Sequence, residues 1–498
     1  MKCSRRAAPP EPSEDGPPPS SSERLIARGL LVIALAVGAA LRVWQALTDD
    51  GLYWPDEIYQ SLEPAHRLVF GYGLVAWEFI AGARNWALPA LVAGLMGLAR
   101  ALGLDSPPGY LGLVKVAFGL LGTATAWGSY RLARAYGAVP LAAAASGALL
   151  SLASMALYFA PRAMSENASA LPVVLGLALG LKPDASRRML GVAASLLGLA
   201  VLMRLQSAVF CVGLLGVLAA RRRWREAGLA LGVLTVWAGL FGLLDRLTWG
   251  QWFHSAIVYL DFNVRQQGGT LWGTAPFSYY GRVLFDGMTG VSGVVALLGV
   301  LALRRATGLA LMVGAFFLVH AMQPHKELRF LVPMFPLAAA LAGVGLDVVL
   351  AEVSALRLRV ALAGVVMVVG GGSALGSRSL TFGALGQYED LKPQASAYDD
   401  SGPINRLLTR AGRREDVCGL KLEHVHIAWT GGYSYFHRNV PLYPHFGPGR
   451  DSGHFNYVIT HVSMSGGGEV VAEEAGHVLV RLPWPGCVAD PGYSWRLP

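Results

Sequence analysis

Long apolar stretches separated by short polar clusters run through most of the chain. The first, 25–47, is too long for the apolar core of a signal peptide, and no small-residue cleavage site follows it. We interpret it as an uncleaved membrane-spanning helix, and other stretches of about 20 residues recur after it. The further predicted spans are 110–134, 138–158, 166–182, 189–204, 205–220, 226–246, 286–303, 307–323, 330–350 and 358–377. The pattern therefore predicts about 11 transmembrane helices.

The segment 86–104 is also apolar but carries Arg100, and it is interpreted as a re-entrant or interfacial helix. If it does not cross and the N-terminus is cytoplasmic, the basic clusters of the remaining loops all fall on the inner side. These clusters are Arg131 with Arg134, Arg187 with Arg188, Arg221 to Arg223, Arg304 with Arg305, and Arg357 with Arg359. The segments that then lie on the outer side are 48–85, 245–285, 320–329 and everything after residue 378.

The two ends of the chain differ from this pattern. Residues 1–22 are rich in Pro, Ser, Glu and Asp and are predicted to be a disordered tail before the membrane core, 23–377. After residue 378 the apolar runs shorten, and β-like runs appear at 457–460 and 477–481. The fold class predicted here is an all-α polytopic membrane protein with a small extramembrane α/β domain over 378–498.

Cys418 and Cys487 both lie in this C-terminal region. If the region occupies an oxidising compartment, as the charge pattern indicates, the two residues can form a disulfide. The pairing is a hypothesis at this point.

Composition agrees with a membrane protein and excludes several other classes. Of 498 residues, 54% are hydrophobic and only 15% are charged, against about 25% in soluble domains. The net charge of +9 does not indicate nucleic acid, because the basic residues cluster in the loops. Neither GxxxxGK[ST], HExxH nor GxSxG occurs, and the four cysteines lack metal-ligand spacing. No cofactor or metal is predicted.

The first candidate for chemistry is the segment Trp54-Pro55-Asp56-Glu57, in the first outer loop. An ionised carboxylate beside a membrane-embedded donor can act as a general base toward an acceptor hydroxyl. The alternative is a solvated loop with a proline turn. Apolar residues at helical spacing follow the segment and predict an amphipathic helix along the membrane surface. These residues are Ile58, Leu62, Ala65 and Val69, and the loop closes with Trp77, Glu78 and Arg84.

The second candidate is the polar segment 323–330, QPHKELRF, between two predicted spans. Pro324 is expected to be the first residue of a helix, whose free N–H groups, with Lys326 and Arg329, would suit a phosphate. The alternative is anchoring at the membrane surface by basic side chains. Ionisable clusters at a membrane edge favour a functional interpretation.

Arg204 is a third candidate, because an arginine between two apolar spans needs an anion, and a lipid phosphate is a natural one. It can equally be a charge that marks the end of a span. Asp245, Asn263 and Arg162 with Glu166 are weaker members of the same outer face. Arg162 and Glu166 can also pair with each other along one helix.

These segments together resemble the eukaryotic mannosyltransferases that use dolichyl-phosphate mannose, above all the type that adds the third mannose of the GPI anchor (PIG-B type). The stretch 54–79, WPDEIYQSLEPAHRLVFGYGLVAWEF, is similar to that family's first lumenal loop, and HKELRF (325–330) to its HKExRF signature. RLQSA (204–208), DRLTWGQW (245–252), FNV (262–264) and GTAPFSYY (273–280) also resemble family segments. Trp54 stands where the family has His, Val75-Ala76 stands where Thr is usual, and a PCHSTP-like segment is missing. These departures, and a composition typical of a bacterial relative, leave the acceptor open.

The resemblance implies a glycosyltransferase-C fold and inverting transfer of a sugar from a polyprenyl phosphate. It implies that Asp56 is the base, and that Glu57 orients the acceptor or supports Asp56. The implied donor-phosphate ligands are His325, Lys326, Arg329 and Arg204. The implied supporting residues are Glu327, Trp54, Trp77, Glu78, Asp245 and Asn263. Transfer is expected to be independent of metal ions.

The sequence therefore predicts an integral multi-pass membrane mannosyltransferase. Its expected partners are polyprenyl- or dolichyl-phosphate mannose, a glycolipid or glycan acceptor, and the lipid bilayer, without nucleic acid. The expected location is the bacterial inner membrane with a periplasmic site, or the ER membrane with a lumenal one. Two alternatives stay open: the same chemistry with another polyprenyl-phosphate sugar, and a lipid or sugar transporter or flippase.

Overall fold

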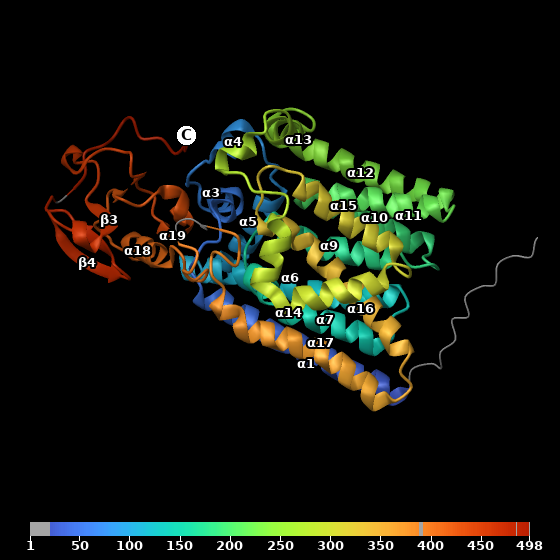
Figure 1. Ribbon diagram of the computed structural model, residues 1–498. Coiled ribbons are helices and arrows are strands. Elements are labelled where there is room, and N and C mark those ends of the chain that lie inside the picture. Colours follow the sequence, from blue (N-terminus) through green and yellow to red (C-terminus); the bar gives the residue numbers. More distant parts are fainter. Residues whose placement is uncertain (1–19, 388–391, 485, 498) are drawn as a thin grey trace, which may run out of the picture.

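A computed structural model describes residues 20–387, 392–484 and 486–497. A bundle of long helices carries an α/β domain at one end (Figure 1). The predicted disordered tail, 1–22, lies almost entirely outside the described residues, and the first helix begins at Ser21.

Every predicted membrane span is helical in the structure, with ends that differ by a few residues. The bundle helices are α1 (Ser21–Thr48), α6 (Pro107–Ala135), α7 (Pro140–Leu152), α8 (Ser154–Phe159), α9 (Ser165–Gly180), α10 (Arg187–Met203), α11 (Ala208–Ala220), α12 (Trp224–Trp249), α14 (Tyr279–Ala302), α15 (Thr307–Ala321), α16 (Phe335–Ala351) and α17 (Leu356–Leu375). In the described part of the chain, five helices, or six with the bent α14, are long and apolar enough to cross a membrane. The protein is an integral membrane protein, because such helices bury their backbone groups in apolar surroundings.

Small residues allow the bundle helices to pack closely. Helix α9 packs between α6 and α10, while α16 packs against both α7 and α14. At Gly345 in α16, an added Cβ would lie only 1.8 Å from the backbone oxygen of Leu298 in α14. Close backbone contact through glycine is a common way for membrane helices to associate.

Helix α14 is bent by 119° around Met288. The predicted span 286–303 therefore begins inside the bend and does not form one straight helix. Ser154 donates its hydroxyl to the carbonyl oxygen of Gly287, 3.0 Å away, which satisfies a backbone group exposed by the break. Such compensation allows a broken helix inside a membrane protein.

Basic side chains join the loops at the end of the bundle where α1 and α17 begin, opposite the α/β domain (Figure 1). The contacts are Arg221 with the carbonyl oxygen of Leu181, Arg223 with that of Ala185, Arg305 with Asp347, and Arg359 with Glu23. This grouping agrees with the predicted arrangement of the arginine clusters at one membrane face.

The first outer loop is mostly helical, as the spacing of its apolar residues predicted. Its elements are α2 (Pro55–Glu57), the π-helical turn η1 (Ile58–Leu62), α3 (Glu63–Phe70) and α4 (Trp77–Ala81), followed by α5 (Ala87–Ala101). Ile58, Leu62 and Ala65 are fully buried. Their face packs against α5 and against the short helix α19 (Gly432–Phe436) of the C-terminal domain.

The C-terminal domain contains a five-stranded mixed sheet in the order β2-β1-β3-β5-β4. Its strands are β1 (Leu420–Leu422), β2 (Leu442–Tyr443), β3 (Tyr457–His461), β4 (Glu469–Glu474) and β5 (His477–Arg481). Strand β1 is parallel to β2 and β3, whereas β5 is antiparallel to β3 and β4. Helix α18 (Gly402–Gly412) packs on this sheet. Both β-like runs found in the sequence are strands, so that prediction is confirmed.

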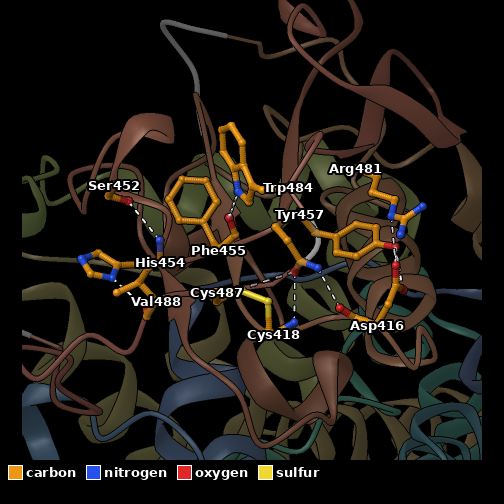
Figure 2. The surroundings of a disulfide bond; sticks show 11 residues. Asp416, Cys418, Ser452, His454, Phe455, Tyr457, Arg481, Trp484, Cys487 and Val488 are labelled. Atoms are coloured by element: carbon orange, nitrogen blue, oxygen red, sulfur yellow. Dashed lines mark hydrogen bonds and ion pairs between the residues drawn. A yellow bond between two sulfur atoms is a disulfide. The ribbon is translucent and has the colours of Figure 1, made fainter.

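A disulfide joins Cys418, just before β1, to Cys487, beyond β5 (Figure 2). Asn456 supports it, because its side chain accepts the N–H of Cys418 and donates to the carbonyl of Asp416. The hypothesised pairing is confirmed. A disulfide in a membrane-attached domain is typical of an oxidising compartment.

Buried polar contacts hold the C-terminal domain against the first outer loop. The carboxyl group of Glu63 accepts the backbone N–H groups of Tyr433 and Ser434, at 2.8 and 3.0 Å. Gly432 has a positive φ of 53°, and a Cβ there would lie 2.0 Å from Glu63 Oε2. Burial raises the pKa of Glu63 to about 8, although the two backbone hydrogen bonds oppose the shift.

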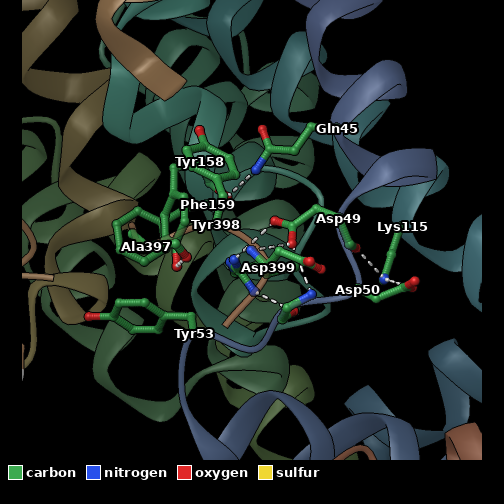
Figure 3. Close-up of polar contacts among 12 residues, drawn as sticks. Gln45, Asp49, Asp50, Tyr53, Lys115, Tyr158, Phe159, Ala397, Tyr398 and Asp399 are labelled. Carbon is green, nitrogen blue, oxygen red and sulfur yellow. Dashed lines mark hydrogen bonds and ion pairs between the residues drawn. The ribbon is translucent and has the colours of Figure 1, made fainter. Parts of the chain in front are cut away.

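A second set of contacts holds the domain to the end of α1 (Figure 3). Asp49 accepts the backbone N–H of Asp399 at 3.0 Å. Lys115 on α6 donates to the carbonyl of Asp49 at 2.7 Å and to the hydroxyl of Tyr435 at 3.0 Å. The domain is therefore fixed over the same end of the bundle as the first outer loop.

Candidate functional site

A cavity of about 540 Å³ lies between the first outer loop, the adjoining ends of the bundle helices and the C-terminal domain. Nine of the residues predicted for the site line it, and they come from segments far apart in the chain. They are Trp54, Asp56, Trp77, Glu78, Arg204, Asn263, His325, Glu327 and Arg329. A cavity of this size with a few convergent charged groups is typical of a small-molecule site.

Arg329 is the centre of the charged cluster. Its guanidinium donates to Asp56 Oδ2 at 2.5 Å and to Glu327 Oε2 at 2.6 Å. A third carboxylate, Glu166, lies 3.4 Å away. The two sequence candidates are therefore in direct contact, although Asp56 and Arg329 are separated by 273 positions.

Arg204 joins the same cluster through Glu166, which is the second residue of helix α9 and is fully buried. Arg204 Nη1 donates to Glu166 Oε1 at 2.7 Å, and that same oxygen faces Arg329. The sequence offered a pair between Arg162 and Glu166, but Arg162 instead pairs with Glu57 and Asp49. Arg162 precedes helix α9, so Arg162 and Glu166 do not lie one turn apart on a helix, as the sequence spacing assumed.

His325 contacts two acceptors. Its Nε2 lies 2.9 Å from Glu327 Oε1, and its Nδ1 lies 3.0 Å from the carbonyl oxygen of Gly273. Only the doubly protonated imidazolium donates to both. Burial opposes this charge, but the hydrogen bond and the charge of Glu327 outweigh it and raise the pKa of His325 above its usual value.

The expected helix start at Pro324 is wrong. The next helical segment, η5 (Leu328–Met334), begins four residues later. The segment before it is fixed instead to the neighbouring loop around Ala275, which donates its N–H to the carbonyl of Pro324 at 3.0 Å. Lys326 strengthens this contact by donating to the carbonyls of Ala275 and Gln323, at 2.7 and 2.5 Å. Lys326 is buried in these contacts and does not line the cavity.

Two further predicted residues also lie outside the cavity lining. Glu57 is buried, and its carboxylate accepts from Arg162 at 2.8 Å and from the N–H of Tyr53 at 3.4 Å. Asp245 accepts the N–H and the hydroxyl of Ser255, which fixes the start of α13 (His254–Leu260). Both carboxylates hold neighbouring segments in place.

Glu78 adds a further carboxyl group to the cavity, near Asp56. Gln60 donates to Glu78 Oε1 at 2.9 Å. Burial, and then the charge of Asp56, raise the pKa of Glu78 to about 7. At neutral pH the cavity therefore contains a carboxyl group that is partly protonated.

An aromatic cluster lines another side of the cavity. The rings of Trp77 and Trp272 are stacked with centroids 5.8 Å apart, and Phe262 lies 4.7 Å from Trp77. The ring of Trp272 also lies 6.4 Å from that of His325. Sequence reasoning did not assign Phe262 and Trp272 to the site. They lie in two short helical turns, η3 (Asp261–Arg265) and η4 (Gly268–Trp272). The signal for Phe262 was the family-like segment FNV, whereas Trp272 had only its large aromatic ring in an outer loop.

The C-terminal domain supplies a further wall, which sequence reasoning did not assign to the site. Its cavity-lining residues are His426, Ile427, Ala428, Trp429, Phe446 and Leu497. Trp429 packs edge-to-face on Trp54, with ring centroids 5.1 Å apart. The short helical turn η7 (Ile427–Trp429) therefore faces the segment that carries Asp56.

Within the described ranges, no group of three or more His, Cys, Asp or Glu side chains is arranged to hold a metal ion. The expected metal independence stays a prediction. The charged groups of the cavity can by themselves bind a phosphate through cations and accept a proton through a carboxylate.

The sequence matches the model of the Alg9-like mannosyltransferase family over residues 33–395. It is 30% identical over 318 residues to GPI mannosyltransferase 3 of Yarrowia lipolytica, covering 62% of this chain and 61% of the relative. It is 28% identical over 319 residues to human GPI alpha-1,2-mannosyltransferase 3, covering 62% and 56%. The matches thus span about three fifths of the length of these curated relatives.

Two solved structures are similar in fold. A crystal structure of ArnT from Cupriavidus metallidurans bound to undecaprenyl phosphate has a TM-score of 0.62 at 16% identity, covering 91% of this chain and 98% of that one. The Archaeoglobus fulgidus oligosaccharyltransferase has a TM-score of 0.50 at 13% identity, covering 88% and 69%. The helical core therefore has a glycosyltransferase-C-like fold.

Proposed function

The chain belongs to the Alg9-like mannosyltransferase family, and from this premise we propose that it is a membrane-embedded inverting glycosyltransferase. In this proposal it moves mannose from polyprenyl-phosphate mannose to a hydroxyl group of a lipid-linked or glycan acceptor. The single observation that carries the proposal is that Asp56 and the cations of Arg204, His325 and Arg329 line one cavity. A carboxylate base and a phosphate-binding cluster are the two parts that such a transfer needs.

The donor phosphate binds the cationic side of the cavity in this mechanism. Arg204, Arg329 and protonated His325 supply three positive charges, and they face the carboxylates of Asp56, Glu166 and Glu327. The phosphate competes with Asp56 for Arg329, so donor binding releases Asp56 toward the acceptor. The fold shared with a protein that was crystallised with undecaprenyl phosphate supports a lipid phosphate as the ligand.

Asp56 then takes the proton of the acceptor hydroxyl, and the hydroxyl oxygen attacks C1 of the mannose. The bond between C1 and the phosphate oxygen breaks, its electron pair goes to the phosphate, and the configuration at C1 is inverted. Asp56 loses its negative charge as the phosphate gains one. Because Arg329 contacts Asp56 at 2.5 Å, it is close enough to stabilise this movement of charge. A phosphate leaving group needs no separate general acid, so a single carboxylate suffices.

The mannose ring fits the aromatic side of the cavity. Trp77 and Trp272 offer ring faces to the C–H groups of a sugar, and Asn263 and Glu78 offer polar groups to its hydroxyls. Glu57, Lys326 and Asp245 act as positioning residues in this proposal, because each is occupied in contacts outside the cavity lining.

We propose eleven membrane crossings for the core, 23–377, with α5 at the interface and α7 and α8 forming one crossing. Helix directions alternate, and the arginine-rich loops share the end opposite the α/β domain, which supports this count. The cavity and the domain 378–498 then lie in the periplasm or the ER lumen. The disulfide between Cys418 and Cys487 supports an oxidising compartment.

The test is a transfer assay with the purified full chain in liposomes. Labelled polyprenyl-phosphate mannose is compared with the corresponding glucose, arabinose and aminoarabinose donors, with and without EDTA. We expect transfer from the mannose donor, unchanged by EDTA and lost in Asp56→Asn. Preference for another donor would replace mannose in the proposal. Movement of lipid across the bilayer without any sugar transfer would overturn the enzyme assignment.

A further inference from the structure

We infer that the wall contributed by the C-terminal domain is the acceptor subsite and selects an uncharged sugar residue. His426, Trp429 and Phe446 are its specificity-determining residues. The inference rests on the proposed function and specifies the substrate class of the same cavity.

The two sides of the cavity differ in charge. The loop and bundle side carries seven acidic or guanidinium side chains: Asp56, Glu78, Arg84, Glu166, Arg204, Glu327 and Arg329. The lining residues from the C-terminal domain include no Asp, Glu, Lys or Arg among the described residues. A phosphate or carboxylate on the acceptor would lose its hydration on this wall without gaining a cationic partner, which is unfavourable. An uncharged sugar avoids this cost of desolvating a charge.

The chemistry of the wall suits a sugar ring. The rings of Trp429 and Phe446 offer aromatic faces, and Phe446 is 57% exposed. His426 Nδ1 accepts the backbone N–H of Ala428 at 3.2 Å, so in the neutral ring Nε2 carries the proton. Burial, and then the nearby His445, lower the pKa of His426, which keeps its ring neutral. A neutral imidazole N–H is a hydrogen-bond donor for a sugar hydroxyl.

The wall is fixed to the helix that carries the proposed base. Tyr59, three residues after Asp56, donates its hydroxyl to the carbonyl of Ile427 at 2.6 Å. Trp54, two residues before Asp56, packs on Trp429 at a centroid distance of 5.1 Å. An acceptor held by η7 is therefore held at a defined position relative to Asp56, as a proton transfer requires.

The wall also lies outside the part of the chain that matches the family model. That match ends at residue 395, whereas His426, Trp429 and Phe446 follow it. Every charged residue of the opposite side lies within the match. Donor chemistry can thus be shared with the relatives while this chain carries its own acceptor surface.

The test compares wild type with His426→Ala, Trp429→Ala and Phe446→Ala in the transfer assay. Octyl α-mannopyranoside serves as the neutral acceptor, and its 6-phosphate serves as the anionic one. We expect each variant to raise the KM for the neutral acceptor by about 10- to 100-fold, with the donor KM and the slow hydrolysis of donor unchanged. Wild type should prefer the neutral acceptor. His426→Gln, which retains an N–H donor, should recover part of the loss.

The control is His461→Ala, an exposed histidine of the same domain outside the cavity lining. It should leave every constant at the wild-type value. Three outcomes would overturn the inference. They are an acceptor KM that is unchanged in the three wall variants, a donor KM that rises as much as the acceptor KM, and a preference of wild type for the phosphorylated acceptor.

A binding measurement separates this inference from the proposed function. Octyl α-mannopyranoside is titrated into wild type and His426→Ala, with the change of tryptophan fluorescence as the signal. Saturable binding that the variant loses supports the acceptor subsite even if no donor is turned over, in which case only the proposed function fails. Absence of saturable binding to wild type overturns the inference.

Discussion

Replacing the two adjacent acids of the first outer loop one at a time tests the assignment of the base. Asp56 lines the cavity, its side chain is 21% exposed, and it forms an ion pair with Arg329. Asp56→Asn removes the base but retains a polar side chain of the same shape. A positioned general base contributes about 10² to 10⁴ in rate, which corresponds to about 3 to 5 kcal/mol of activation free energy. Arg329 keeps Glu327 and Glu166 as partners in this variant, so the free energy of unfolding should fall by less than the ~3 to 5 kcal/mol of an uncompensated buried pair.

Glu57→Gln should lose stability but keep its rate of transfer. The side chains of Glu57 and Arg162 are 3% and 4% exposed and pair at 2.8 Å. Removing one partner of a buried ion pair lowers the free energy of unfolding by about 3 to 5 kcal/mol. The retained amide should bring the loss toward the lower value. The folded fraction should keep a kcat near that of wild type, because Glu57 does not line the cavity.

The assay measures kcat with polyprenyl-phosphate mannose and octyl α-mannopyranoside, and unfolding in mixed micelles by circular dichroism. Wild type and both variants are compared at equal folded concentration. A Glu57→Gln protein that folds normally but has lost its kcat, beside an active Asp56→Asn protein, would refute the assignment. A loss of stability in Asp56→Asn as large as in Glu57→Gln would refute the structural distinction between the two acids.

Three further predictions concern charge, the disulfide and the docking of the C-terminal domain. The raised pKa of His325 means that its cation persists to higher pH than usual and is lost as pH rises through that pKa. The donor KM of wild type should therefore increase with pH, and the donor KM of His325→Gln should vary less. Initial rates measured across pH test this. Replacing both Cys418 and Cys487 by Ser opens a loop of 69 residues and should destabilise the domain by about 4 kcal/mol. The variant should therefore unfold at a lower urea concentration than wild type. Unfolding of both proteins at the same urea concentration would contradict this. The pKa of Glu63 is about 8 because burial favours the protonated form, so docking should weaken as pH rises toward 8 in wild type. In Glu63→Gln docking should not vary with pH, and Gly432→Ala should undock the domain at every pH. Limited proteolysis reports docking, and pH-independent cleavage of wild type would disprove the role of Glu63.

The sequence by itself determined the helices of the core and the strands near the C-terminus. Apolar stretches of about 20 residues must satisfy their backbone hydrogen bonds locally within a membrane, so the helix is the only form open to each. The bend of α14 at Met288 was not predicted, because its stability depends on a hydroxyl from Ser154 in another helix. The sequence also located two segments of the candidate site, 54–57 and 325–329, and nine of the twelve predicted residues line the cavity.

Only the tertiary structure decided which of these side chains meet. Successive residues of a helix point about 100° apart, so Asp56 and Glu57 face different neighbours, Arg329 and Arg162. Sequence spacing reports neighbours within one element, but ion pairs between helices depend on how whole elements pack. For the same reason the wall around Trp429 was invisible in the sequence: it becomes part of the cavity only when the C-terminal domain docks on the first outer loop.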